Sequence, residues 1–349
     1  MSSNRPLGFF VKLANAKLVT DDDWLDFSPE SLEYIASGPK VGKIYLRRCY
    51  RQLIDLMGLV NKGVVETEAC RYLITGTPGI GKSLFLIFVL WELLQKNKRV
   101  LYCSGSTIVY YDVNGACWIM DAVPGLRVYD ITQTDCLFWR KDLYCLYDLQ
   151  DTKESSALER VSYKYCQFLL CTSPKRGSYN DYVKGLNAKR RFFMLIWSEK
   201  EMRRIAPLYT RSNAWEKVYK YLGGIPRSVL SREVHETAAL AEIKSGSLIC
   251  DFHRVKKLTE DPDEVISIDD MDHIHRIIHI HSTQPFNRPT LKFASEDAIY
   301  YVCMAHVAAV ENHWKEMVGV DLPQNLCGNL VGKYFEIRAL KILEEGGRA

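Results

Sequence analysis

The chain has 349 residues, enough for two or three packed domains of about 100 to 200 residues each. Hydrophobic residues make up 47% of it, aromatic residues 11% and charged residues 25%, which excludes a chain that is disordered throughout. The 46 basic and 42 acidic residues leave a net charge of +4, too small an excess to indicate nucleic-acid binding by itself.

The eleven cysteines form no CxxC pair, and several lie inside apolar runs such as LYCLYD. This pattern is typical of buried free thiols in a reducing compartment such as cytosol or nucleoplasm. The N-terminal residues contain no sustained apolar segment, and the chain has no run of about 18 uncharged apolar residues. We therefore expect no signal peptide, no membrane span and no membrane partner.

The first expected region is an N-terminal lead-in and helix at residues 1–60. Residues 1 to about 40 are predicted to be extended apart from a short helix after Ser28 and Pro29, a capping residue followed by a proline. Residues 43–60 are predicted to be helical because their apolar residues recur at helical spacing.

Residues 61–198 alternate strand-like and helical runs, which predicts an α/β core with a mostly parallel sheet covered by helices. A helix is expected at 82–95, and the Asn114-Gly115 turn indicates an antiparallel insertion. The strand-like runs are YLITG at 72–76, RVLYC at 99–103, TIVYY at 107–111, LRVYDI at 126–131, LYCLYD at 143–148, QFLLCTS at 167–173 and RFFMLIW at 191–197.

Two further regions follow the core. Residues 199–255 are predicted to form a helical subdomain that contains the sequence GGIPR at 223–227. Residues 256–349 are predicted to form a small C-terminal α+β region, beginning with an acidic linker or surface loop at 256–270. A histidine-rich strand at 273–282 is expected to present a solvated face, with a zinc site as the alternative.

The sequence GTPGIGKS at 76–83 matches the G-x-x-x-x-G-K-[ST] motif of nucleotide-binding loops, with a strand before it and a helix after it. Gly76, Gly79 and Gly81 permit backbone angles that let successive N–H groups point at phosphate oxygens. Lys82 is expected to reach the β- and γ-phosphates, and Ser83 to hold Mg²⁺. The residues predicted to bind ATP are Gly76, Thr77, Pro78, Gly79, Ile80, Gly81, Lys82, Ser83 and Leu84.

Magnesium in such sites needs a second protein contact, usually an acid at the end of a neighbouring strand. Asp148 ends the apolar run LYCLYD and is the predicted Walker B aspartate, with Asp130 as the competing candidate. Many P-loop ATPases carry a catalytic glutamate directly after this acid, and here that position is Leu149. Asp151 or Glu154 is then the candidate base for the attacking water.

Two polar positions further along the chain are candidate sensors of the γ-phosphate. Ser173, or Thr172 beside it, follows a predicted strand, although a hydroxyl before a proline turn is equally typical of a strand end. Arg227 follows a Gly-Gly-Ile-Pro break and is predicted to contact bound phosphates, with an ordinary surface arginine as the alternative.

The ordered set of IYLRRCYRQLIDLM, YLITGTPGIGKSLFLIFVLWEL, FLLCTSP, GGIPRSVL and GKYFEIRALKILEEGG resembles the Crinkler effectors and the related retrotransposon hot spot proteins. The resemblance implies an AAA-like or STAND-like P-loop NTPase, usually coupled to a C-terminal nuclease-like or kinase-like domain. It implies a secreted effector that acts in the cytoplasm or nucleus of a host cell. It places the Walker B acid at Asp148, the strand-end serine at Ser173 and the GGIPR arginine at Arg227.

Two departures from the family pattern affect these expectations. The N-terminus begins inside the region that precedes the NTPase, without the ubiquitin-like header and its LxLFLAK-type translocation motif. The chain ends where a restriction-endonuclease-like domain would open, at a helix with Glu336 and no later D…ExK set. Nucleic acid is therefore expected as a partner only with a further domain.

The predicted function is an Mg-ATP-binding module that hydrolyses ATP to switch conformation. The alternative is a nucleotide-stabilised binding or assembly module with little turnover, because Leu149 stands where a catalytic glutamate is usual. The expected partners are the nucleotide and either a host protein or a second copy of the chain.

Overall fold

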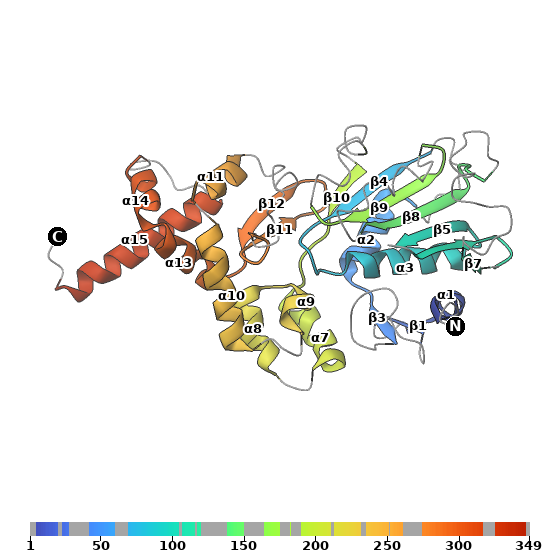
Figure 1. Cartoon of the computed structure of the whole chain (residues 1–349), viewed down its shortest axis with the longest axis horizontal. Helices are drawn as coiled ribbons and strands as arrows, with labels where there is room; N and C mark the ends of the chain where they lie inside the picture. The colour runs from blue at the N-terminus through green and yellow to red at the C-terminus, as the bar shows by residue number, and fades with distance from the viewer. Residues whose placement is uncertain are drawn as a thin grey trace. The chain divides into compact units, whose positions relative to one another are not determined.

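A seven-stranded sheet forms the core of the first of two units into which the chain divides (Figure 1). The first unit comprises Met1–Gly76, Gly81–Met194 and Thr283–Arg288, and the second comprises Thr77–Ile80, Leu195–Ser282 and Pro289–Ala349. The structure, a computed structural model, describes residues 5–19, 23–27, 42–59, 69–104, 107–115, 117–119, 138–149, 164–174, 182, 190–210, 213–231, 235–250, 252–260, 274–316 and 325–346.

The strand order in this sheet is β10-β4-β9-β8-β5-β6-β7. The strands from β10 to β5 run parallel, whereas β6 and β7 are added antiparallel at one edge. The predicted mixed α/β fold with a mostly parallel sheet is therefore confirmed, as is the antiparallel insertion. The strands are β4 (Arg71–Thr75), β5 (Arg99–Ser104), β6 (Thr107–Tyr111), β7 (Cys117–Ile119), β8 (Leu143–Leu149), β9 (Gln167–Thr172) and β10 (Arg191–Phe193).

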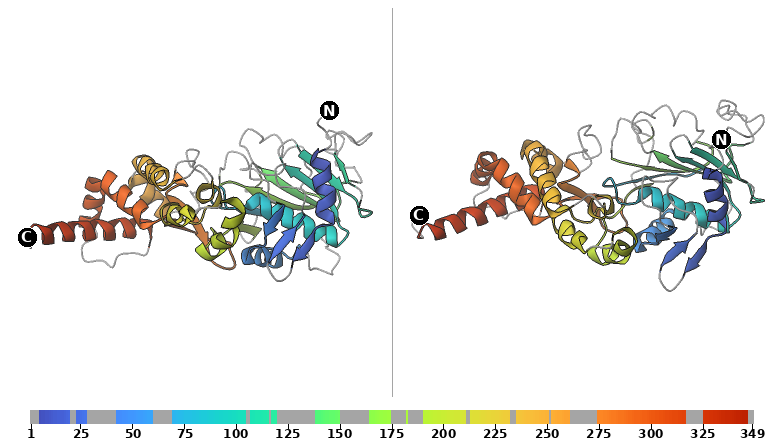
Figure 2. Two further views of the ribbon diagram at one scale, coloured as in Figure 1. Left: turned by 90° about the horizontal axis from the view of Figure 1, so that it is seen from below. Right: turned by 60° about the horizontal axis from the view of Figure 1, so that its bottom comes forward.

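Helix α3 (Lys82–Gln95) lies across one face of this sheet and contacts β5, β8 and β9. Residues 85–91 are all buried, which is the pattern of a helix enclosed on every side. Helix α1 (Arg5–Ala14) supplies part of the enclosure, because it packs against both α3 and β7 (Figure 2). The predicted helix at 82–95 is confirmed.

Two expectations for the N-terminal region are wrong. Residues 5–14 form helix α1 instead of an extended segment, because Phe9, Phe10 and Leu13 give it one buried face. Residues 43–45 form a strand instead of the start of a helix, because they pair antiparallel with an earlier strand. The resulting elements are β1 (Lys17–Val19), β2 (Trp24–Asp26), β3 (Lys43–Tyr45) and α2 (Arg48–Met57). The short helix expected after Ser28 lies outside the described residues.

The second unit is mainly helical, as predicted for 199–255. The two strands β11 and β12 form an antiparallel hairpin within it. Its elements are α7 (Glu199–Tyr209), α8 (Ala214–Leu222), α9 (Pro226–Val229), α10 (Glu236–Ile249), α11 (Phe252–Glu260), β11 (Ile278–Ser282), β12 (Pro289–Phe293), α13 (Glu296–Ala305), α14 (Val307–Glu316) and α15 (Leu326–Glu344). Among the helices described in both units, none is long and apolar enough to cross a bilayer.

Two expectations within this unit need correction. The linker expected at 256–270 is wrong for 256–260, which continue helix α11, and the rest of it is not described. The histidine-rich strand starts only at Ile278, so His275 lies in a turn. Burial lowers the pKa of His279 to about 3 and that of His281 to about 4, and His279 is fully buried while His281 is partly buried, so the predicted solvated face is wrong for His279. No three His, Cys, Asp or Glu side chains of the described residues form a metal site.

The glycine pair between α8 and α9 is required by close packing. Gly223 has φ 63°, and a Cβ added to it would lie 2.8 Å from the His279 ring. A Cβ added to Gly224 would lie 1.9 Å from the carbonyl oxygen of Trp197, a contact that no side chain can make without moving the backbone. Trp197 also donates its backbone N–H to the Gly224 carbonyl at 2.9 Å.

We predict that Gly224→Ala lowers the free energy of unfolding by about 3 kcal/mol or more, because the methyl group overpacks a backbone contact. Gly332→Ala is the matched control. Gly332 lies in helix α15, and a Cβ added to it would meet no atom within 4 Å. We expect this control to be neutral or to stabilise by up to about 1 kcal/mol, as alanine favours helix over glycine. Urea unfolding of both variants checks the pair, and equal stability of the two variants would contradict the packing argument.

Candidate functional site

The loop between β4 and α3 has the backbone that the glycine motif requires. Gly76, Gly79 and Gly81 have φ angles of 144°, 81° and 96°, a region that side chains disfavour. Gly81 is the N-cap residue of α3, and no side chain caps this helix start. The first turn of α3 also contains no acidic residue. The positive end of the α3 dipole therefore faces the loop without a competing acid in the first turn of the helix.

Lys82 lies at this helix start with only 8% of its surface exposed. Its Nζ donates to the Gly76 carbonyl at 2.9 Å, across the mouth of the loop. The Tyr50 hydroxyl donates to the Gly81 carbonyl at 2.9 Å and so fixes the end of the loop against α2. Ser83 and Leu84 follow in the first turn of α3 and are half-buried.

The central residues of the loop, Thr77 to Ile80, make their contacts within the second unit. The backbone N–H of Ile280 in β11 donates to the Thr77 hydroxyl at 2.9 Å. The indole N–H of Trp197 donates to the Ile80 carbonyl at 2.7 Å. Thr77 and Ile80 are fully buried, whereas Pro78 and Gly79 between them are partly exposed. The loop is thus held at both ends of its exposed tip.

Asp148 lies near the carboxyl end of β8 and is 3% exposed. Its register partners are Ser104 on β5 and Cys171 on β9, and the Ser104 hydroxyl lies 3.3 Å from its Oδ2. The pKa of the Cys171 thiol is raised chiefly by burial and further by the Asp148 charge, whereas Lys82 lowers it. The charges of Asp148 and Lys82 thus affect the pKa of this thiol in opposite directions.

The residue after Asp148 cannot serve as a base, because Leu149 is apolar and 3% exposed. The other candidates for this role, Asp151 and Glu154, lie outside the described residues, as does Asp130. The structure describes Asp148 alone among these acids.

The proposed γ-phosphate sensors occupy the end of β9. Thr172 is 4% exposed and donates its hydroxyl to the Ser173 carbonyl at 3.1 Å, while the Ser173 side chain is half-buried. On β4, the buried Thr75 hydroxyl has no hydrogen-bond partner among the described residues. Sequence reasoning missed Thr75, although its place directly before the first motif glycine was a usable signal.

Arg227 lies beside the tip of the loop within the second unit. A Cβ added to Gly79 would be 2.9 Å from the Arg227 Cβ and 3.1 Å from the Ile225 Cγ2. The Arg227 side chain is exposed, and Pro226 before it starts α9. The GGIPR turn therefore packs directly on the glycine at the middle of the motif.

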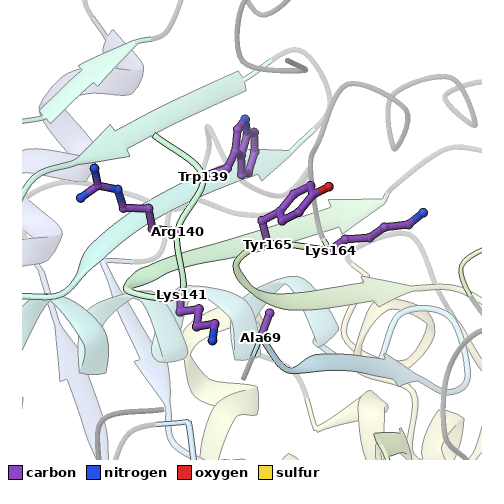
Figure 3. A pocket seen from close by; sticks show the side chains of 6 residues that line it. All are labelled: Ala69, Trp139, Arg140, Lys141, Lys164 and Tyr165. Atoms are coloured by element: carbon purple, nitrogen blue, oxygen red, sulfur yellow. The ribbon is translucent and has the colours of Figure 1, made fainter. Parts of the chain in front are cut away.

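A pocket lies at the amino ends of the parallel strands, the ends opposite to the one at which the glycine-rich loop begins. This pocket of about 480 Å³ lies just before β4, β8 and β9 (Figure 3). Its lining residues are Ala69, Trp139, Arg140, Lys141, Lys164 and Tyr165. The three cationic side chains point away from one another in Figure 3, so they do not converge on one ligand. The loop at Gly76 remains the better candidate site.

No protein-family model matches the chain. Two curated proteins are similar to it, Crinkler effector protein 15 and Crinkler effector protein 16 of Phytophthora infestans. They are 30% identical over 340 residues and 29% identical over 341 residues. Each alignment covers 97% of this chain and 51% of the relative, so the chain spans about half the length of the curated relatives it matches. The resemblance predicted from the motifs is thus confirmed as similarity to Crinkler effector proteins over almost the whole chain.

Proposed function

We propose that the chain is the Mg-ATP-binding P-loop NTPase module of a Crinkler-like effector and hydrolyses ATP to switch conformation. The observation that carries the proposal is the loop from Gly76 to Ser83, which joins a buried parallel strand to an uncapped helix. The carboxyl ends of parallel strands are the edge at which open α/β sheets bind ligands. The similarity to two Crinkler effector proteins supports the effector part of the proposal.

The described residues fit a magnesium nucleotide. The N-cap Gly81 makes no side-chain cap and the first turn of α3 has no acid to compete with phosphate, and the Thr75 hydroxyl at the end of β4 is buried with no hydrogen-bond partner among the described residues. Lys82 would exchange its bond to the Gly76 carbonyl for the β- and γ-phosphates. Ser83 and Asp148 would hold Mg²⁺ between them, the serine directly and the aspartate directly or through water. The bound ion would offset the negative charge of the phosphates.

A second candidate function is a nucleotide-stabilised binding or assembly module with little turnover. The observation that favours it is the buried Leu149 in the position after Asp148. In either case we propose action inside host cells, in cytoplasm or nucleus, after secretion. The partner would be a host protein or a second copy of the chain, and nucleic acid would require a further domain.

We predict that a saturating magnesium nucleotide stabilises the wild-type chain, by about 2.7 kcal/mol when its concentration is 100 times Kd. Lys82→Ala should abolish this stabilisation, because the phosphates lose their main cation. Lys96→Ala, an exposed lysine just past the other end of α3, is the matched control and should keep it. Thermal unfolding with and without Mg-ATP measures both. An unchanged melting temperature for the wild-type chain with millimolar nucleotide would contradict the proposal.

Phosphate release separates the two candidate functions on the same proteins. A switch that hydrolyses ATP should release phosphate in a Lys82-dependent manner. The contrasting result is that the wild-type chain binds nucleotide, and loses that binding with Lys82→Ala, without releasing phosphate in a Lys82-dependent manner. That result would exclude the hydrolysing switch and leave the binding or assembly module.

We predict that Arg227→Ala weakens binding of a non-hydrolysable ATP analogue by about tenfold to a hundredfold and weakens ADP binding much less. A charge-assisted hydrogen bond to the γ-phosphate, worth about 1.5 to 3 kcal/mol, is lost only with the triphosphate. Lys220→Ala, an exposed cation on α8, controls for the change of net charge. Parallel calorimetric titrations decide it. Equal losses for both nucleotides, or no loss for either, would make Arg227 a structural residue.

A further inference from the structure

Aromatic side chains fix two consecutive carbonyl groups of the loop. The Trp197 indole donates to the Ile80 carbonyl at 2.7 Å, and the Tyr50 hydroxyl donates to the Gly81 carbonyl at 2.9 Å. In a trans peptide group the carbonyl and the following N–H point in opposite directions. Trp197 therefore turns the N–H of Gly81 away from itself, and Tyr50 does the same for the N–H of Lys82. These two amides begin α3, where an anion is expected.

Trp197 is also joined to the arginine-bearing turn. Its backbone N–H donates to the Gly224 carbonyl at 2.9 Å, and its own carbonyl approaches Gly224 so closely that only glycine fits. Beyond Gly224, Ile225 and Arg227 pack on Gly79 in the same loop. Within the second unit, Trp197 thus contacts the loop through its ring and the GGIPR turn through its backbone. A shift of the Ile80 carbonyl can therefore reach the turn through the side chain and backbone of Trp197.

We infer that Trp197 is a positioning residue of the loop, one that presets the Gly81 amide for phosphate and couples the loop to the turn at Gly223 to Arg227. The inference rests on the proposed function insofar as it names a phosphate as the ligand. The positioning of the loop by Trp197 concerns the nucleotide-free chain and can be tested without a ligand. Binding of a phosphate at the Gly81 amide would strain or relax the Ile80 peptide group. The indole would transmit that change to Gly224 and so to Arg227.

The indole N–H, more than the bulk of the ring, carries this role. Trp197 is 3% exposed, so phenylalanine would keep most of the packing while removing the donor. Trp215 on α8 belongs to the same unit and is 6% exposed, which makes Trp215→Phe a matched control. Both substitutions delete one buried indole, but only the first deletes a bond to the loop.

The first test uses amide hydrogen exchange on the nucleotide-free chain. Trp197→Phe should speed exchange about two- to tenfold in peptides that cover 76–82 and 223–227, the range expected from one lost hydrogen bond. Trp215→Phe should leave both peptides at the wild-type rate. Unchanged exchange in the Trp197→Phe chain would overturn the inference, whether or not the chain binds nucleotide.

The second test uses ligand binding and fluorescence. Mg-ADP should bind the Trp197→Phe chain about two- to tenfold more weakly than the wild-type chain. The change in tryptophan fluorescence on adding nucleotide should disappear in Trp197→Phe and persist in Trp215→Phe. Equal affinity together with a persistent fluorescence change would overturn the coupling. A wild-type chain that binds no nucleotide would overturn the proposed function instead. The hydrogen-exchange experiment would still test whether Trp197 positions the loop, because it needs no nucleotide.

Discussion

The structure depends on one constraint: the chain must turn from a largely buried strand into a helix with a buried middle, without capping that helix. Residues 85–91 of α3 are all buried and the helix contacts β5, β8 and β9, so its position on the sheet is fixed by burial. Three glycines with positive φ make the turn possible, and Gly81, the N-cap residue of α3, has no side chain with which to cap the helix. An uncapped helix start is a suitable place for an anion. The nearby lysine now bonds a loop carbonyl, which is consistent with a site prepared for phosphate.

The loop belongs to both units of the chain. Its ends are anchored in the first unit by Lys82 and Tyr50, whereas Thr77 and Ile80 are anchored in the second unit by Ile280 and Trp197. A ligand that reshapes the loop would therefore change the contacts of its end residues as well as those of Thr77 and Ile80. This property suits a conformational switch and equally suits a module whose assembly is stabilised by nucleotide.

Much of the α/β core was predictable from the sequence because its strands and α3 are continuous apolar runs with clear boundaries. The helix predicted at 82–95 and the strand ending in Asp148 needed only local patterns. The strand at 43–45 was missed because its pairing with β2 overrode the helical spacing of its apolar residues. Such pairing joins residues that are distant in the sequence, so a short stretch of sequence does not reveal it. Trp197 was missed for the same reason: its bond to Ile80 joins residues 117 positions apart. Gly224 was noticed as a helix break, but only the packed structure explains why it must be glycine.

The most direct measurement of the central claim is a crystal structure of the chain grown with Mg-ADP. We expect phosphate density at the start of α3, within hydrogen-bonding distance of the Gly81 and Lys82 amides. We also expect that the Lys82 Nζ has left the Gly76 carbonyl, on which it now lies at 2.9 Å, for the β-phosphate. Nucleotide density elsewhere on the chain, or an unchanged bond between Lys82 and Gly76 at full nucleotide occupancy, would contradict the account.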